Sequence, residues 1–179
     1  MEDLEQEEIV VLVDETNEIL GYLGKLEAHK KGLLHRAISV IVFNSKGEML
    51  LQQRAFTKYH WAGIWSNTCC SHPRKDEGFK EAAERRLFEE LGIQITLDEQ
   101  FNFVYKAYDE KSGLTEHEYD VVFTGVFDGS FEINRDEVEA TKWIEVKDLL
   151  ADIAKRPDEY SFWFKIILEE MQKRGTLTT

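Results

Sequence analysis

The sequence predicts an α/β sandwich around a mixed sheet, folded as a single domain. Strand-like runs recur along most of the chain, one long internal segment has helical spacing, and the C-terminus is helical, a combination typical of this fold class. A length of 179 residues with 42% hydrophobic residues suffices for one compact core, and no stretch rich in Pro, Gly or Ser divides the chain. We therefore expect one domain over residues 1–179, with a motif-bearing core of about 36–146 and a C-terminal helical segment of about 147–174.

The N-terminal half contains three strand-like runs. Residues Ile9–Val13 are apolar and β-branched, and a second such run covers residues 36–43. A polar turn over residues 44–47 follows, so Glu48–Arg54 is predicted as the returning strand of a hairpin.

The middle of the chain contains the clearest helix. Its apolar residues recur every four positions: Phe79, Ala83, Leu87 and Leu91. This spacing predicts an α-helix, and the glycine that follows, Gly92, is a typical C-cap.

The C-terminal half predicts three more strands and a last helix. Aromatic residues alternate over residues 101–105, and residues 118–127 are rich in β-branched and aromatic side chains. Residues 143–146 are a short strand candidate, and a helix is predicted from about residue 160 to residue 173.

The charge of the chain restricts its partners. The formal net charge is −13, whereas binding to a nucleic-acid backbone depends on clustered Lys and Arg. We therefore exclude nucleic acid as a partner. A small diphosphate remains compatible, because a few basic side chains in a pocket outweigh a diffuse acidic surface that salt screens over about 8 Å.

The cysteines and the apolar runs indicate a cellular compartment. The only two cysteines, Cys69 and Cys70, are neighbours and cannot join distant parts of a fold, so they are expected to be free thiols in a reducing environment. The apolar runs are strand-sized, far below the roughly 20 residues of a membrane span, and the acidic N-terminus does not resemble a secretory signal. We expect a cytoplasmic protein without membrane association.

The segment around the predicted helix resembles the Nudix signature, G-x5-E-x7-R-E-U-x-E-E-x-G-U, in which U is a bulky aliphatic residue. Seven positions match at the required spacing: Glu77, Arg85, Leu87, Glu89, Glu90, Gly92 and Ile93. The resemblance implies a Nudix-like α/β/α sandwich. Carboxylates at the end of a helix offer hard oxygen ligands to Mg²⁺. The alternative is a solvated acidic helix stabilised by ion pairs such as Arg85 with Glu89.

Two positions depart from that signature. Ser71 stands in place of its first Gly, and Arg86 stands in place of the first Glu of the pair. Arg86 lies four residues before Glu90, so a cation replaces one carboxylate of an i, i+4 pair. This change weakens the multi-metal cluster with which Nudix hydrolases activate water.

Two further motifs make the resemblance more specific. The sequence WSNTCCSHP ends shortly before the helix, and EHE follows at residues 116–118. With these motifs the chain resembles the type I isopentenyl-diphosphate isomerases from about residue 25 to residue 163. The resemblance implies that the protein interconverts isopentenyl diphosphate and dimethylallyl diphosphate by protonation and deprotonation, in isoprenoid biosynthesis.

The same resemblance implies a metal site that holds Mn²⁺ or Zn²⁺. The matching ligands are His29, His35, His72, Glu116 and Glu118. Strand geometry agrees, because Glu116 and Glu118 would point to one face of a strand while His117 points to the other. For His60 and His117 we favour a surface or hydrogen-bonded role.

Four residues match the family's catalytic machinery: Cys70, Glu118, Tyr105 and Trp163. Moving a double bond requires one proton to be added and another removed. Cys70 and Glu118 match the proton-handling pair, and a thiol with the reference pKa of about 8.5 would need little tuning. Tyr105 would hydrogen-bond Glu118, and Trp163 would stabilise a carbocation through its ring, although both could equally be core residues. Cys69 is interpreted as a small buried hydrophobe.

The diphosphate is expected to bind basic side chains. Lys25, Arg54 and Lys58 match the family's diphosphate-binding positions, with a further contact near Ser71. Glu90 matches the position that holds Mg²⁺ against the diphosphate.

Two other functions are compatible with parts of the sequence. One is a Nudix hydrolase that cleaves a nucleoside or other diphosphate, which Glu77, Glu89 and Glu90 allow and Arg86 disfavours. The other is a binding module with a structural zinc, which the absence of C-x2-4-C pairs disfavours. A hydrolase would release phosphate or a monophosphate, and the isomerase would not.

Overall fold

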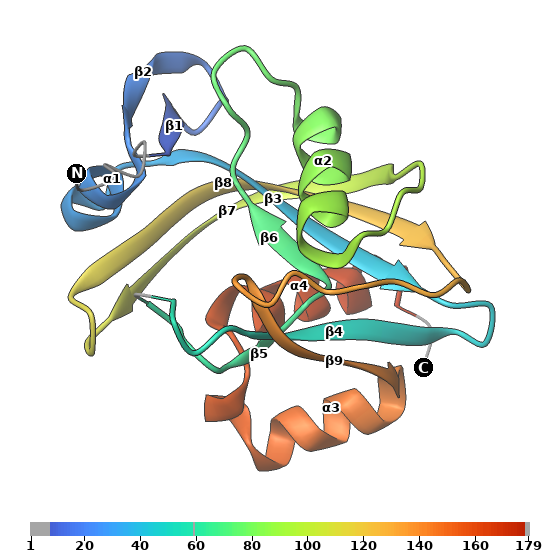
Figure 1. Cartoon of the computed structure of the whole chain (residues 1–179). Helices are drawn as coiled ribbons and strands as arrows, with labels where there is room; N and C mark the ends of the chain where they lie inside the picture. The colour runs from blue at the N-terminus through green and yellow to red at the C-terminus, as the bar shows by residue number, and fades with distance from the viewer. Residues whose placement is uncertain (1–7, 59, 178–179) are drawn as a thin grey trace, which may run out of the picture.

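The structure, a computed structural model, describes residues 8–58 and 60–177 and contains strands and helices interspersed along the chain (Figure 1). In chain order the elements are β1 (Ile9–Val13), β2 (Ile19–Gly24), α1 (Lys25–Lys31), β3 (His35–Phe43), β4 (Glu48–Arg54), β5 (Trp65–Ser66), β6 (Cys69–Ser71), α2 (Phe79–Leu91), β7 (Asp98–Asp109), β8 (Leu114–Val126), β9 (Val138–Glu145), α3 (Val146–Lys155), the 3₁₀ turn η1 (Pro157–Glu159) and α4 (Phe162–Lys173). The predicted α/β class is confirmed.

All the named strands join one mixed sheet in which β3 is the central element. β3 pairs in parallel with β8, whereas its pairings with β1, β4 and β6 are antiparallel. β7 extends the sheet beyond β8, and β9 pairs with β4. The parallel register sets His35 opposite Glu118 and Phe43 opposite Val126.

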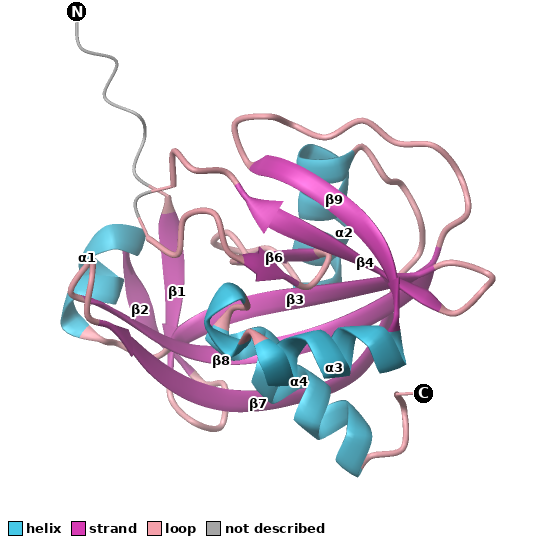
Figure 2. Ribbon diagram, turned by 90° about the horizontal axis from the view of Figure 1, so that it is seen from below, coloured by secondary structure: helices cyan, strands magenta, loops and turns pink. Residues whose placement is uncertain are grey.

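Helices cover both faces of this sheet. α2 lies on one face and α3 and α4 lie on the other (Figures 1 and 2). Because side chains alternate along a strand, β3 contributes to two separate apolar clusters. Val40 and Val42 pack in the cluster of Leu87 from α2, and Ile41 packs in the cluster of Phe164 from α4. The expected α/β/α sandwich is confirmed.

The helix α2 has the predicted bounds. Its residues Ala83, Leu87 and Leu91 are completely buried against the sheet. Gly92 ends the helix in the left-handed conformation, with φ of 64°. A Cβ atom at this position would lie 3.1 Å from the carbonyl oxygen of Glu132, so both the backbone angle and the close approach favour glycine.

Several predicted boundaries need correction. β9 covers Val138–Glu145 rather than residues 143–146, and Val146 begins α3 instead of ending a strand. The N-terminal part of β9 was missed because it mixes polar and half-exposed side chains, which obscure a strand pattern. β5 and β6 contain two and three residues and are too short for periodicity to reveal them.

None of the helices in residues 8–58 and 60–177 has both the length and the apolar content needed to cross a bilayer. The predicted division into a core of about 36–146 and a helical segment of about 147–174 stays a prediction, although α3 and α4 both lie almost wholly in the second range.

Candidate active site

The five side chains proposed as metal ligands lie together in the structure. They are His29 from α1, His35 from β3, His72 after β6, and Glu116 and Glu118 from β8. All five are buried, and each offers one ligand atom that lies within 4.8 Å of the other four. Imidazole nitrogens combined with carboxylate oxygens form a donor set that suits a divalent metal ion.

The strand β8 positions both glutamates. Glu116 and Glu118 point into the site, while His117 points away and its Nδ1 hydrogen-bonds the carbonyl oxygen of Gly32 at 3.0 Å. The predicted common face of the two glutamates is confirmed, and His117 has the hydrogen-bonded role expected for it.

Backbone carbonyls orient two of the imidazoles. Nδ1 of His35 donates to the carbonyl oxygen of Leu33 at 2.8 Å, and Nδ1 of His29 donates to that of Lys25 at 2.5 Å. This leaves the Nε2 lone pair of His35 directed at Glu118, whereas Nε2 of His29 hydrogen-bonds Oε2 of Glu116 at 2.8 Å. Nε2 of His35 is buried, forms no hydrogen bond within the described residues and lies 3.6 Å from Oε1 of Glu118. A divalent cation fits this nitrogen and these carboxylates.

His60 also reaches the site, which the sequence did not reveal. Its Nε2 lies 2.6 Å from Oε1 of Glu116, whose other oxygen lies 2.8 Å from Nε2 of His29. Of the two roles considered for His60, the hydrogen-bonded one is confirmed, since the residue is buried. Its loop has no periodic pattern, so only the tertiary structure could identify this contact.

The Cys70 sulfur faces the cavity and has three polar neighbours. It donates a hydrogen bond to Oδ1 of Asn67 at 2.9 Å and accepts one from Nε1 of Trp163 at 3.0 Å. The hydroxyl oxygen of Ser39 lies 3.7 Å away and itself donates to Oδ2 of Asp120 at 2.7 Å. Cys70 and Trp163, which are 93 positions apart in the sequence, are therefore in direct contact.

The expectation of a thiol with an unshifted pKa is wrong. Burial, together with the nearby carboxyl group of Asp120, raises the pKa of Cys70 to about 12. Desolvation disfavours the thiolate, and a neighbouring negative charge disfavours it further. Cys70 consequently holds its proton at neutral pH.

Tyr105 contacts Glu118 as expected. The two residues lie opposite each other on β7 and β8, and the Tyr105 hydroxyl donates to Oε2 of Glu118 at 2.7 Å. Burial alone would raise the pKa of Glu118, but its contacts with His35, Glu116 and Tyr105 outweigh burial and lower it. Burial and the Glu118 charge together raise the pKa of Tyr105, so the phenol remains a hydrogen-bond donor.

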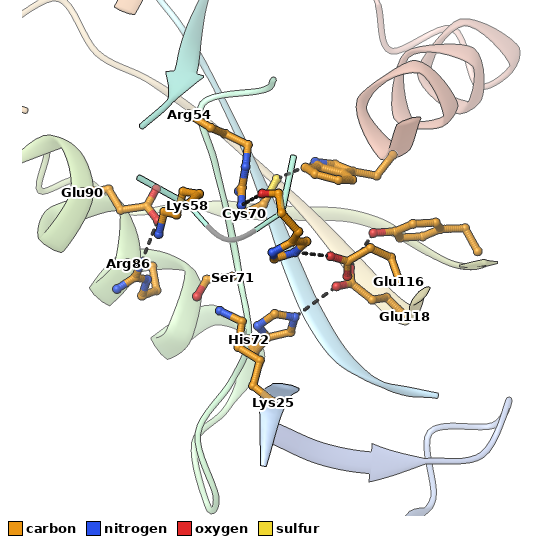
Figure 3. Close-up of a pocket in the computed structure, with 13 residues that line it drawn as sticks. Lys25, Arg54, Lys58, Cys70, Ser71, His72, Arg86, Glu90, Glu116 and Glu118 are labelled. Carbon is orange, nitrogen blue, oxygen red and sulfur yellow. Dashed lines mark hydrogen bonds and ion pairs between the residues drawn. The ribbon is translucent and has the colours of Figure 1, made fainter. Parts of the chain in front are cut away.

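A cavity joins these groups to basic side chains (Figure 3). Its lining comprises Lys25, Arg54, Lys58, His60, Cys70, Ser71, His72, Arg86, Glu90, Tyr105, Glu116, Glu118 and Trp163. Lys25 comes from α1, Arg86 from α2, and Arg54 and Lys58 from the end of β4 and the loop that follows it. Four basic side chains thus lie in one pocket of an acidic protein. Such a group of Lys and Arg residues is what the sequence predicts for a bound diphosphate.

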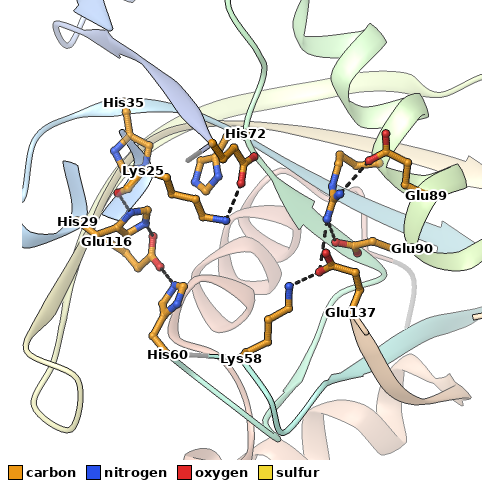
Figure 4. A network of polar contacts seen from close by, with 12 residues as sticks. Lys25, His29, His35, Lys58, His60, His72, Glu89, Glu90, Glu116 and Glu137 are labelled. Atoms are coloured by element: carbon orange, nitrogen blue, oxygen red, sulfur yellow. Dashed lines mark hydrogen bonds and ion pairs between the residues drawn. The ribbon is translucent and has the colours of Figure 1, made fainter. Parts of the chain in front are cut away.

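Glu89, Glu90 and Glu137 lie close together in Figure 4. Arg86, which lines the cavity, lies among these three carboxylates. Its guanidinium contacts Oε1 of Glu90 at 2.7 Å, Oε2 of Glu89 at 2.8 Å and Oε2 of Glu137 at 3.5 Å. Glu137 also pairs with Lys58, and Gln52 donates to the second oxygen of Glu90 at 2.9 Å. The pairing expected on this helix, that of Arg85 with Glu89, is confirmed at 3.0 Å. Glu137 is a further residue that the sequence did not single out.

Two residues near the motifs have packing roles. Cys69 is completely buried in the cluster beside α2, in agreement with its interpretation as a small hydrophobe. Trp65 packs at the edge of the other cluster, where the Lys142 ammonium lies 4.3 Å from its ring centroid. Neither residue lines the cavity.

Comparison with known proteins shows which families this chain resembles. Residues 33–164 match the NUDIX domain family. The chain is 48% identical over 165 residues to isopentenyl-diphosphate Delta-isomerase 2 of Aromatoleum aromaticum, which is 92% of this chain and 87% of that protein. It is 49% identical over 162 residues to isopentenyl-diphosphate Delta-isomerase 2 of Photorhabdus laumondii, which is 90% of this chain and 91% of that protein.

Solved structures support the fold. The crystal structure of DR0079 from Deinococcus radiodurans superposes with a TM-score of 0.67 at 20% sequence identity, covering 83% of this chain and 90% of that one. At this level of identity the similarity concerns the architecture alone.

Proposed function

The chain belongs to the NUDIX family and, within it, to the type I isopentenyl-diphosphate Delta-isomerases, and on that premise we propose that its cavity interconverts isopentenyl diphosphate and dimethylallyl diphosphate. The observation that carries the proposal is the meeting of Cys70 and Glu118 in one cavity whose lining includes four basic residues. A hydrolase needs a water-activating carboxylate cluster, but here Glu90 is paired with Arg86, and Glu89 is paired with both Arg85 and Arg86.

Cys70 and Glu118 are the proposed proton-handling pair. One carbon of the substrate gains a proton and another loses one, so the reaction leaves the total number of protons unchanged. Cys70 holds a proton and Glu118 has a lowered pKa, so together they offer one donor and one acceptor. One direction of the reaction begins with this arrangement, and the reverse direction begins with the proton on the carboxyl group.

Tyr105 and Trp163 are proposed to assist this pair. Tyr105 donates a hydrogen bond to Glu118 and fixes the direction of that carboxylate. Trp163 lines the cavity beside Cys70, where its π face can stabilise a developing carbocation. Both side chains are almost fully buried, which helps to exclude water from a cationic intermediate.

The basic side of the cavity is proposed to bind the diphosphate. Lys25, Arg54 and Lys58 line it, and Ser71 adds a contact near the same end. Charge-assisted hydrogen bonds from Lys and Arg would fix the phosphates and so hold the allylic chain near Cys70.

Two metal sites are proposed. His29, His35, His72, Glu116 and Glu118 would hold Mn²⁺ or Zn²⁺, and Glu90 would hold Mg²⁺ against the diphosphate. When bound, such ions neutralise charge and alter the basicity of the carboxylates that hold them. The buried Nε2 of His35, directed at Glu118, supports the first site.

Product analysis tests the proposal. The protein is incubated with isopentenyl diphosphate, Mg²⁺ and Mn²⁺, and the products are separated by chromatography while phosphate release is assayed. We expect dimethylallyl diphosphate without released phosphate. Released phosphate or monophosphate, or an unchanged substrate, would contradict it. The cytoplasmic location and the lack of nucleic-acid partners stay predictions.

A further inference from the structure

Asn67 is a completely buried residue beside the proposed proton-handling thiol. It lies in the loop between β5 and β6, three residues before Cys70. No motif assigned it a role, yet all of its side-chain hydrogen-bonding groups are engaged. Its amide nitrogen donates to the carbonyl oxygen of Val40 at 3.1 Å and to that of Cys69 at 3.0 Å.

These two contacts fix the orientation of the amide. Both hydrogens of Nδ2 are used by carbonyl oxygens, so Oδ1 must point the other way. In a flipped amide, Oδ1 would face the two carbonyl oxygens, and the two N–H groups of Nδ2 would face the Ser66 hydroxyl and the Cys70 thiol. In the buried setting such unsatisfied contacts are costly, and the flip is disfavoured.

Oδ1 of Asn67 is therefore a fixed acceptor. It receives hydrogen bonds from the Cys70 thiol at 2.9 Å and from the Ser66 hydroxyl at 2.8 Å. Because Nε1 of Trp163 donates to the same sulfur at 3.0 Å, the sulfur is held between one donor and one acceptor. Few rotamers of Cys70 can satisfy both contacts at once.

The two contacts are braced by one network. Ser66, which donates to Asn67, lies 2.9 Å from the hydroxyl oxygen of Ser161. Ser161 precedes α4, and its backbone N–H donates to the carbonyl oxygen of Trp65 at 2.9 Å. This places Trp163, two residues further on, in a constant position relative to the Asn67 loop.

We propose that Asn67 is a positioning residue for Cys70. Its amide oxygen holds the thiol hydrogen in the resting protein and keeps the sulfur facing the cavity, so that the thiol is aligned when a substrate carbon arrives. The proposal concerns the same site as the proposed function and rests on it for its kinetic consequence, but the hydrogen bond itself is measurable without substrate.

Infrared spectroscopy of the S–H stretch tests the hydrogen bond directly. The chain has only two cysteines, so Cys69→Ala leaves Cys70 as the single thiol, and the band is assigned by its loss in Cys69→Ala/Cys70→Ala. A hydrogen-bonded S–H group absorbs at a lower wavenumber than a free one. We expect the S–H stretch of the folded Cys69→Ala protein at a lower wavenumber than the S–H stretch of a simple thiol dissolved in an alkane. A band at the free-thiol position would overturn the proposal without any change at Asn67.

The Asn67→Ala variant, made in the Cys69→Ala background, tests the residue itself. We expect its S–H band to move toward the free-thiol position, kcat to fall about tenfold, as for one lost hydrogen bond, and KM to stay within about twofold. Ser161→Ala, in the same background, is the matched control: it removes a hydroxyl that contacts Ser66 and leaves the acceptor Oδ1 of Asn67 in place, so its band should shift much less than that of Asn67→Ala. An unmoved band in Asn67→Ala would overturn the proposal.

The kinetic and spectroscopic results separate the two claims. A parent protein that does not isomerise the substrate contradicts the proposed function, while its S–H band still decides the role of Asn67. A raised KM with an unchanged kcat in Asn67→Ala would indicate a merely structural role and would overturn the positioning role.

Discussion

Tyr105 and Glu118 lie opposite each other on β7 and β8, and the phenol donates to the carboxylate at 2.7 Å. On the other side of Glu118, β3 carries His35 in register with it. This carboxylate therefore has a cross-strand neighbour on each side: Tyr105, which hydrogen-bonds it, and His35, a candidate metal ligand whose Nε2 lies 3.6 Å from it. The sheet register thus couples the proposed metal site to the proposed acid–base chemistry.

The first prediction concerns this contact. Tyr105→Phe removes a hydrogen bond to a charged group, worth about 1.5–3 kcal/mol, so kcat should fall about 10- to 100-fold with little change in KM. Tyr108→Phe is the matched control, since Tyr108 lies on the same strand and is exposed. Steady-state kinetics on isopentenyl diphosphate provide the measurement. Equal kcat values for the two variants would show that the Tyr105 hydroxyl has no role.

The second prediction concerns the metal. We expect the protein to retain one Mn²⁺ or Zn²⁺ after dialysis, and His72→Ala to lower the affinity more than about 100-fold, because losing an outer-shell partner alone costs 10- to 100-fold. His117→Ala should keep the metal, since His117 faces away from the site. Elemental analysis and metal titration of the three proteins measure this effect. Retention of the metal by His72→Ala would remove His72 from the ligand set.

The third prediction concerns Arg86. Arg86→Ala leaves Glu90 buried without its charge partner, which should lower the free energy of unfolding by about 3 kcal/mol, near the low end for a broken buried ion pair. Mg²⁺ should restore part of this loss, because Glu89, Glu90 and Glu137 would then offer oxygen ligands to a cation.

Urea denaturation with and without Mg²⁺ measures the Arg86 effect. Lys80→Ala is the control, since Lys80 forms an exposed pair with Glu84 at 3.9 Å, and it should change stability by less than about 0.5 kcal/mol. An Arg86→Ala protein as stable as Lys80→Ala would contradict the account of the carboxylate network.

The fourth prediction concerns pH. Burial alone would raise the pKa of Glu137, but the charges of Lys58 and Arg86 outweigh burial and lower it. A carboxyl with a lowered folded-state pKa stabilises the protein above the unfolded value of about 4.3 and loses that contribution as the pH falls through the folded value. Glu137→Gln should therefore be about 1 kcal/mol less stable than the parent at pH 7, and this difference should shrink as the pH falls below about 4.3. Urea denaturation of the parent and of Glu137→Gln, with a metal chelator present, measures the difference at each pH. A stability difference that stays constant with pH would contradict this prediction.

Much of the fold could be predicted from local pattern. The bounds of α2, Phe79 and Leu91, could be predicted from the spacing of its apolar residues. An amphipathic face and a glycine C-cap are properties of the local sequence. The start of β9 and the short strands β5 and β6 could not be predicted, because pairing with distant strands rather than local composition creates them.

The candidate site divides in the same way. Residues in motifs, such as Cys70, His72 and Glu118, could be named from the sequence and do meet in the structure. His60 and Asn67 could not, because a buried histidine in a loop and an oriented amide depend on contacts up to 56 residues away. The raised pKa of Cys70 could not be predicted from the sequence either, because burial in the folded protein is its main cause.

The most direct test of the central claim measures deuterium. Isopentenyl diphosphate is incubated with the protein in D₂O with Mg²⁺ and Mn²⁺, and the product is analysed by mass spectrometry and NMR. We predict deuterated dimethylallyl diphosphate from the parent and from Cys69→Ala, and at least about a 100-fold lower rate from Cys70→Ala and Glu118→Gln. Product formation at the parental rate in Cys70→Ala, or product without deuterium, would contradict the assignment of Cys70 and Glu118 as the proton-handling pair.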